Sequence, residues 1–308
     1  MIEDYSWKLA AKSDSLFLRA KMLQAIRRFF VKKGFLEVET PLLIPAPAPE
    51  VHIDAVAVGD WFLQTSPELC MKRMLAAGYR KIFQICKCFR EKERGARHLP
   101  EFTVLEWYRA DADYHDLMDD CEDLITGVAK ELGLYEIPSP KNQSLLLKKP
   151  WQRITVQDAF VRYAGMRVSE AIKSDHFDEV LACSIEPLLG LKRPVFLCDY
   201  PKEHGSLARF NEKKGVAERF ELYIAGIEIA NGFSELNDAD EQRRRFEEAS
   251  QEREKGGRSV YPLSEKFLEA LRQMPRSAGI AVGVDRLAML FAGKKRIDDV
   301  VAFTPEIL

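Results

Sequence analysis

Long apolar runs are missing from this sequence of 308 residues. No stretch approaches the roughly eighteen consecutive apolar residues that a membrane-spanning helix needs. The N-terminal segment, MIEDYSWKLAAKSDS, carries acidic residues and lacks the apolar segment of a secretory signal peptide. We therefore expect a cytoplasmic protein with no membrane partner.

Metal-binding cysteine patterns and a strong net charge are also missing. The six cysteines form no CxxC pair and have no histidine at zinc-ligand spacing, so we expect reduced, mostly buried thiols and no zinc site. The formal net charge is −2, and no long Lys/Arg tract provides the positive surface that binds a large nucleic acid. A tRNA partner is therefore disfavoured.

The composition, with 46% hydrophobic and 31% charged residues, is typical of an ordinary folded protein. Apolar periodicity and capping residues predict helices that start at Ser13 and Leu69, and others near 114–132, 155–164, 175–189, 239–254, 264–273 and 285–292. Alternating or apolar runs predict strands at 35–41, 61–65, 81–90, 101–110, 194–200, 219–233 and 279–284. Because helices do not regularly separate these strands, we expect an antiparallel α+β sheet flanked by helices, in one domain over residues 1–308.

Two segments carry polar side chains where a structural element begins or is buried. Ser66 and Glu68 flank a proline that favours the first turn of a helix, which places both at a helix mouth. Period-two alternation puts Phe102, Glu106 and Tyr108 on one face of the strand that follows the charged, presumed mobile loop 91–100. A strand facing solvent does not need an aromatic ring, an acid and a phenol together.

Two later runs add charged groups. GIEIANGFSE places Glu228, Asn231 and Glu235 in an otherwise apolar strand, and buried acids need compensation. Magnesium with ATP phosphates would compensate them; the acids could instead face a sheet edge or pair with Arg90 or Arg286. GIAVGVDR is a small-residue strand that runs into a helix with Arg286 at its start.

In order and separation, these segments and the strand ending at Pro41 resemble the three signature motifs of class II aminoacyl-tRNA synthetases. HLPEFTVLEWYRA and IEIANGFSEL resemble the lysyl branch in particular. Only 34 residues precede the first motif, so the anticodon-binding OB-fold domain of lysyl-tRNA synthetases would not fit there. The chain therefore resembles the elongation factor P lysine ligase family, which attaches β-lysine to a lysine of that translation factor. The segment TSPELCMKRMLAAG and Ala281, where lysyl-tRNA synthetases have glycine, sharpen this resemblance.

The resemblance implies activation of (R)-β-lysine or lysine by ATP and Mg²⁺, transfer to elongation factor P, and a homodimer with Pro41 near its interface. Catalysis would depend on Arg90 at the α-phosphate, Arg286 at the γ-phosphate, and Glu228 and Glu235 as magnesium ligands. ATP would also contact Glu91, Lys92, Glu93, His98, Leu99, Phe102, Ile229 and Gly283. The amino acid would contact Ser66, Glu68, Glu106, Tyr108, Asn231, Glu235 and Ala281, with Glu106 and Tyr108 at its ammonium group.

Two positions depart from the family pattern. Lys92 stands where the second motif has an adenine-contacting glutamate, which Glu91 or Glu93 could replace, and Leu99 stands where an asparagine is common. Two other functions stay open: an enzyme that passes α-lysine to tRNA or a small molecule, and a catalytically inactive binding paralogue.

Overall fold

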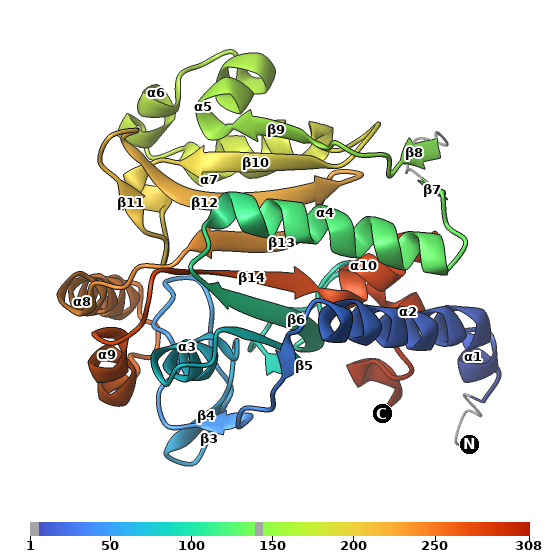
Figure 1. The fold of residues 1–308 in the computed structure, drawn as a ribbon, viewed down its shortest axis with the longest axis horizontal. Coiled ribbons are helices and arrows are strands. Elements are labelled where there is room, and N and C mark those ends of the chain that lie inside the picture. The colour runs from blue at the N-terminus through green and yellow to red at the C-terminus, as the bar shows by residue number, and fades with distance from the viewer. Residues whose placement is uncertain (1–5, 139–143) are drawn as a thin grey trace.

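The computed structural model describes residues 6–138 and 144–308, and a nine-stranded sheet forms its centre (Figure 1). In spatial order the strands are β1 (Leu36–Glu37), β5 (Lys81–Phe89), β6 (Glu101–Ala110), β14 (Ser277–Gly283), β13 (Ile227–Ser234), β12 (Val216–Ile224), β10 (Val195–Tyr200) and β9 (Gln152–Thr155), with β11 (Phe210–Asn211) beside β12. Neighbours are antiparallel except for the parallel pairs β1/β5 and β9/β10. The predicted α+β class is confirmed.

Three helices cover one face of this sheet (Figure 1). They are α2 (Ser13–Lys32), α4 (Tyr114–Glu131) and α10 (Val284–Phe291), and the short helix α1 (Ser6–Ala10) precedes them. Apolar residues between these helices and the sheet, among them Phe30, Leu105 and Trp107, form the largest core cluster. Leu105 and Trp107 alternate with Glu106 and Tyr108 along β6, so the second pair faces the opposite side. That opposite side holds the polar site.

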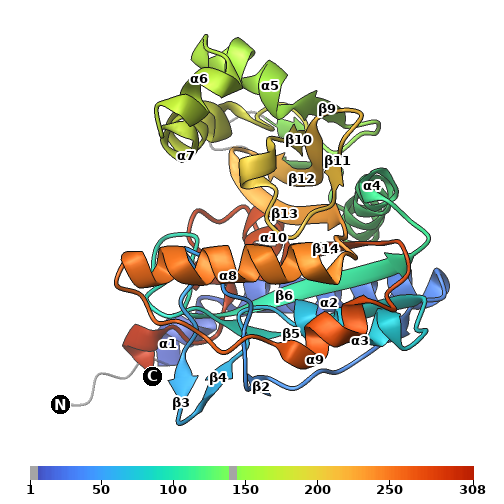
Figure 2. The ribbon, with the colours of Figure 1, turned by 90° about the vertical axis from the view of Figure 1, so that its left-hand side faces the viewer.

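Three other helices gather at one end of the molecule, on the left of Figure 1 and toward the viewer in Figure 2. They are α3 (Glu68–Ala76), α8 (Ala239–Lys255) and α9 (Glu265–Leu271). A further group packs around β9 and β10 and has its own apolar cluster: α5 (Val156–Ala159), α6 (Val168–Lys173) and α7 (Phe177–Val180). Small sheets form from β2 (Leu43–Ile44), β3 (Ala57–Val58) and β4 (Trp61–Leu63), and from β7 (Glu136–Pro138) and β8 (Ser144–Leu146).

The prediction of a single strand over 219–233 is wrong. The chain folds there into a hairpin, with β12 and β13 paired antiparallel and joined at Ala225 and Gly226. Both turn residues have positive φ values, 56° and 72°, which matches the type of two-residue turn that suits a twisted hairpin. Alanine rarely adopts this conformation, so the turn was hidden in an apolar run.

Two further predictions need correction. The helix expected near 175–189 is divided into α7, a π-helical turn and a 3₁₀ turn. The strand expected at 35–41 contributes only β1 to the sheet. All six cysteines are free, and Cys183 is exposed whereas Cys88, Cys121 and Cys198 are buried. Within 6–138 and 144–308, no helix combines the length and apolarity that a bilayer crossing requires.

The proline-rich connector after β2 is fixed by one buried arginine on α8. Arg253 is 0% exposed and donates to the carbonyl oxygens of Glu50 (2.6 Å) and Ile53 (2.8 Å) and to the carboxylate of Asp54 (2.8 Å). Tyr261 adds a hydroxyl that accepts from Arg253 (2.8 Å). Since guanidinium donors and buried carbonyls satisfy one another here, the connector has a defined path along the polar side of the sheet.

Candidate active site

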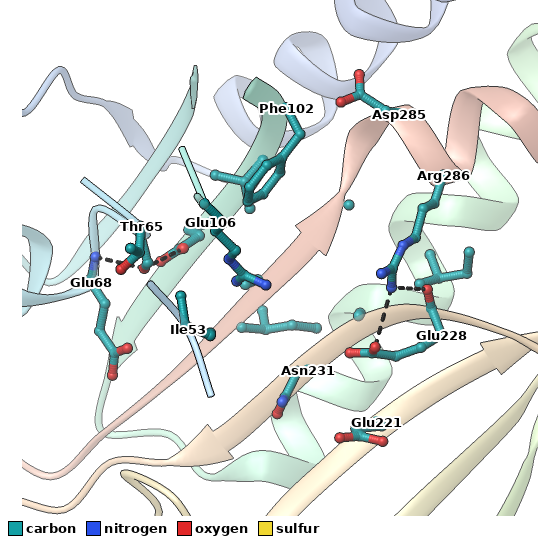
Figure 3. A pocket seen from close by; sticks show the side chains of 18 of the residues that line it. Ile53, Thr65, Glu68, Phe102, Glu106, Glu221, Glu228, Asn231, Asp285 and Arg286 are labelled. Carbon is teal, nitrogen blue, oxygen red and sulfur yellow. Dashed lines mark hydrogen bonds and ion pairs between the residues drawn. The ribbon is translucent and has the colours of Figure 1, made fainter. Parts of the chain in front are cut away.

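A cavity of about 370 Å³ opens on the polar side of the sheet (Figure 3). Most residues predicted for the site line it: Ser66, Glu68, Arg90, Glu93, His98, Leu99, Phe102, Glu106, Tyr108, Glu228, Ile229, Asn231, Ala281, Gly283 and Arg286. Three predicted residues are not among its lining residues: Glu91, Lys92 and Glu235. The strands β6, β13 and β14 lie side by side beneath the cavity, which is why motifs distant in sequence meet there.

One end of the cavity, the amine end, is lined by Ser66, Glu68, Glu106 and Tyr108, and Glu235 is buried behind these residues. The Glu106 carboxylate accepts from the hydroxyls of Ser66 (2.7 Å) and Tyr108 (2.8 Å). The Ser66 hydroxyl oxygen also accepts from the backbone N–H of Glu68 (3.0 Å), which orders the start of α3. Burial raises the pKa of Glu106 to about 7, and the neighbouring Glu68 adds to this rise. This end therefore contains more carboxyl groups than cations.

Glu235 lies beneath this end, at the close of β13. Its carboxylate is 1% exposed and forms an ion pair with Lys72 of α3. Oε2 is the oxygen in this ion pair, and Oε1 has no polar partner within the described residues. Burial raises the pKa of Glu235 to about 8, against the lowering effect of Lys72.

The expected pairing of Glu228 and Glu235 around one magnesium ion needs correction. The two residues stand seven positions apart on one strand, so their Cα atoms are roughly 20 Å apart at about 3.3 Å per residue. Glutamate side chains cannot span that separation to share one ion, and Glu235 is already paired with Lys72.

The structure places Glu221 beside Glu228 instead (Figure 3). Because of the hairpin, Glu221 of β12 lies opposite Asn231, and the register of the two strands shifts between Leu222 and Tyr223. This bulge leaves Ile229 without a partner and brings Glu228 to the cavity side together with Asn231. Burial raises the pKa of Glu221, and Glu228 raises it further while Arg219 opposes the rise.

Glu221 and Glu228 suit a magnesium ion that arrives with phosphates. Within the described ranges, no group of three or more His, Cys, Asp or Glu residues forms a metal cage. Magnesium usually takes one or two protein carboxylates and completes its shell with substrate phosphates and water. Glu221 accepts from Arg219 (2.6 Å) and Tyr223 (2.6 Å), so the ion would replace one of these contacts and take its other ligands from Glu228 and a nucleotide.

The second end of the cavity, the phosphate end, contains Arg286 in the first turn of α10. Its guanidinium donates to the carbonyl oxygen (2.9 Å) and the carboxylate (3.2 Å) of Glu228, and to Nε2 of His98 (2.6 Å). The pairing of a strand acid with Arg286, one of the alternatives from the sequence, is therefore present. Burial, with Arg286, lowers the pKa of His98, so the neutral ring can accept.

Arg90 stands between the two ends. Its guanidinium lies 5.0 Å above the ring of Phe102 and 3.6 Å from the Glu93 carboxylate. Glu91 and Lys92 pair with each other away from the cavity (3.2 Å). Of the two acids that could replace the missing adenine contact, Glu93 is thus the one at the cavity. The side chain of Leu99 is buried in the core and offers no polar contact.

Sequence reasoning missed five further charged residues of the cavity: Glu50, Arg97, Arg219, Glu221 and Asp285. Arg219 donates to Glu221 (2.6 Å), to Asn231 (3.3 Å) and to the carbonyl oxygen of His204 (2.7 Å). The Ala225-Gly226 pair could have indicated that Glu221 belongs to the site. A two-residue turn there pairs the two strands and brings Glu221 and Glu228 to one surface.

Comparisons with known proteins agree with this geometry. Residues 7–306 match the model of the family "tRNA synthetases class II (D, K and N)". The chain is 39% identical to the elongation factor P–(R)-β-lysine ligase of Pectobacterium atrosepticum, with 99% of both chains covered. It is 38% identical to the ligase of that name from Mannheimia succiniciproducens and 37% identical to the one from Proteus mirabilis, with 98% of each chain covered.

Proposed function

Because this chain belongs to the class II tRNA synthetase family, and within it to the elongation factor P–(R)-β-lysine ligases, we propose that it activates (R)-β-lysine or lysine with ATP and transfers it to a lysine side chain of elongation factor P. The observation that carries this proposal is the two-ended cavity. Acids and a phenol stand at one end, and arginines with two carboxylates stand at the other. Such a cavity suits a substrate with an ammonium group at one end and a reacting carboxylate near ATP at the other.

In the activation step, the substrate carboxylate attacks the α-phosphate and pyrophosphate leaves. Arg90 holds the two approaching anions, and Arg286 holds the γ-phosphate once it exchanges its contacts with Glu228 for the nucleotide. Glu106 and Tyr108 keep the ammonium group fixed at the far end, which aligns the carboxylate. Glu221 and Glu228 would hold the magnesium ion, which supplies charge neutralisation at the phosphates.

In the transfer step, an acceptor amine attacks the carbonyl carbon of the adenylate and AMP leaves. The phosphate end keeps more solvent access than the amine end, since the side chains of Arg286 and Glu228 are 21% and 36% exposed. The acceptor lysine therefore enters from the phosphate side. ATP and a translation factor as substrates place this reaction in the cytoplasm.

We further propose a homodimer through the first motif. Apolar side chains stand exposed along α2 and the segment that follows it: Phe17, Val31, Leu36, Leu42 and Leu43, with Pro41 also exposed among them. These exposed apolar side chains support the proposal, because apolar groups on a surface favour association. A sedimentation experiment that finds only monomer at micromolar concentration would count against it.

The function is tested by ATP–pyrophosphate exchange with α-lysine and (R)-β-lysine, followed by intact-mass analysis of elongation factor P after incubation with enzyme and ATP. We expect exchange with (R)-β-lysine and a matching mass gain on the factor. Exchange without the mass gain would move the acceptor elsewhere, to tRNA or a small molecule. No exchange with any basic amino acid would reject the enzymatic proposal.

A further inference from the structure

The amine end contains a cation that belongs to the protein itself. Lys72 stands one turn after Glu68 on α3, and its side chain is 0% exposed. Its ammonium lies 2.5 Å from the Glu68 carboxylate, forms an ion pair with Glu235 and lies 5.1 Å from the centre of the Phe233 ring. A buried ammonium is costly unless acids compensate it, so this lysine depends on both glutamates.

The acids outnumber this cation. Glu68, Glu106 and Glu235 all face the amine end, whereas Lys72 contacts only Glu68 and Glu235. Burial lowers the pKa of Lys72, but the two carboxylates outweigh burial and raise it above its ordinary value. Lys72 therefore stays charged, and the three carboxyl groups outnumber it, so an added ammonium group would favour the ionised forms of Glu106 and Glu235.

Glu235 also has unused hydrogen-bonding capacity. Its Oε2 contacts the Lys72 ammonium, whereas Oε1 has no polar partner within the described residues and lies beside Gly279 and the ring of Tyr108. Buried carboxylate oxygens normally accept hydrogen bonds, so Oε1 is suited to a donor that arrives with the substrate.

We propose that Lys72 is a positioning residue for amino-acid binding: it keeps the Glu68 and Glu235 carboxyl groups in place so that the amine end accepts one ammonium group of the substrate. The inference rests on the proposed function only in that the incoming group is an ammonium of lysine or β-lysine. Lys72 does not touch the reacting carboxylate or the phosphates, so it acts through the two acids alone.

Loss of the Lys72 charge should weaken binding of the amino acid but not binding of ATP. In Lys72→Met the side chain keeps a similar length, but Glu68 and Glu235 become buried acids without a counter-ion, and such acids take up protons. A protonated acid no longer attracts an ammonium group. Amino-acid affinity should therefore fall, while the phosphate end keeps its geometry.

The experiment compares the wild type, Lys72→Met, Lys72→Arg and the control Arg73→Met in ATP–pyrophosphate exchange. Arg73 neighbours Lys72 on the same helix but is exposed and outside the cavity. In Lys72→Met we expect KM for the amino acid to rise about 30-fold or more, while KM for ATP and kcat change less than about threefold. Lys72→Arg should recover most of the loss because it restores the charge, and Arg73→Met should behave as the wild type.

A double variant keeps the inference testable if Lys72→Met alone unfolds. When Glu235→Gln removes one of the two acids, adding Lys72→Met should raise KM for the amino acid by clearly less than it does in the wild type, because only the part that acts through Glu68 remains and residues in one network are not additive. The inference is overturned if Lys72→Met leaves KM for the amino acid unchanged, if KM for ATP rises equally, or if the double variant shows the full additional loss.

The same assay separates this inference from the proposed function. A wild type without exchange for any basic amino acid would reject the proposed function. A wild type that exchanges normally, beside a Lys72→Met variant that does so as well, would reject only the role of Lys72.

Discussion

The amine end and the phosphate end share the same strands, but they hold their charges differently. Lys72, Glu106 and Glu235 are each 1% exposed and are fixed by helix α3 and strands β6 and β13. Arg286 and Glu228 are partly exposed and pair with each other. A small ammonium group needs a preorganised set of acceptors, whereas a large nucleotide with its magnesium needs side chains that can change partners on its arrival.

The largest expected effect is a loss of rate in the exchange reaction when the phosphate end is changed. Arg286→Ala should lower kcat in the exchange reaction by about 10²- to 10³-fold, because one charge that stabilises the phosphates is lost. Its free energy of unfolding should change by no more than about 1 kcal/mol, since a partly exposed ion pair contributes little. Exchange kinetics and urea unfolding measure both. Arg272→Ala, which breaks an exposed pair with Asp240 far from the cavity, serves as the control.

A crowding mutation should disturb the amine end alone. A Cβ atom on Gly279 would overlap the Tyr108 ring and the Glu235 carboxylate. We expect Gly279→Ala to cost about 1–3 kcal/mol of stability and to raise KM for the amino acid about tenfold. On the same strand, a Cβ on Gly283 would meet Arg286 at an ordinary 3.6 Å, so Gly283→Ala should leave stability nearly unchanged. Equal losses in both variants would contradict the difference between the ends.

The two ends should also differ in their response to pH. Burial raises the pKa of Glu106 to about 7 and that of Glu235 to about 8. Both must be ionised to bind an ammonium group, and the lysine ammonium stays charged throughout this range. The value of kcat/KM for the amino acid should therefore fall about tenfold or more per pH unit below pH 7 and level off above pH 8. A flat profile from pH 6 to 9 would show that neither acid binds the substrate as a carboxylate.

The smallest effect is expected midway between the ends. Ala281 pairs with Asn231 on one side and Glu106 on the other, and lines the cavity. Removal of its methyl group in Ala281→Gly should change the ratio of kcat/KM for α-lysine and β-lysine by less than about tenfold, because one carbon discriminates weakly. KM for ATP should stay constant in the same assays.

The sequence predicted the parts of the fold that have strong local patterns. Helices α2 and α4, strands β5 and β6, and the helix mouth at Ser66 follow from amphipathic spacing and capping residues. The hairpin at Ala225 could not be read in this way, because its turn lacks polar residues and uses an alanine at positive φ. That residues 1–308 form one domain stays a prediction.

The site was predictable as a set of residues but not as an arrangement. Alternation along β6 placed Glu106 and Tyr108 correctly toward the cavity. The bulge at Ile229 and the pairing of Glu221 with Glu228 depend on strand register, which a single strand does not reveal. Lys72 resembled a surface lysine because its burial depends on Glu235, a residue far away in sequence.

The contacts of Arg253 with the connector also form late during synthesis of the chain. Arg253 follows Glu50 by 203 residues, and a ribosome adds roughly 5–20 residues each second. The connector is therefore made about 10 s or more before the arginine that fixes it. A nascent chain that ends before α8 has no partner for the carbonyls of Glu50 and Ile53, so it cannot yet enclose a substrate.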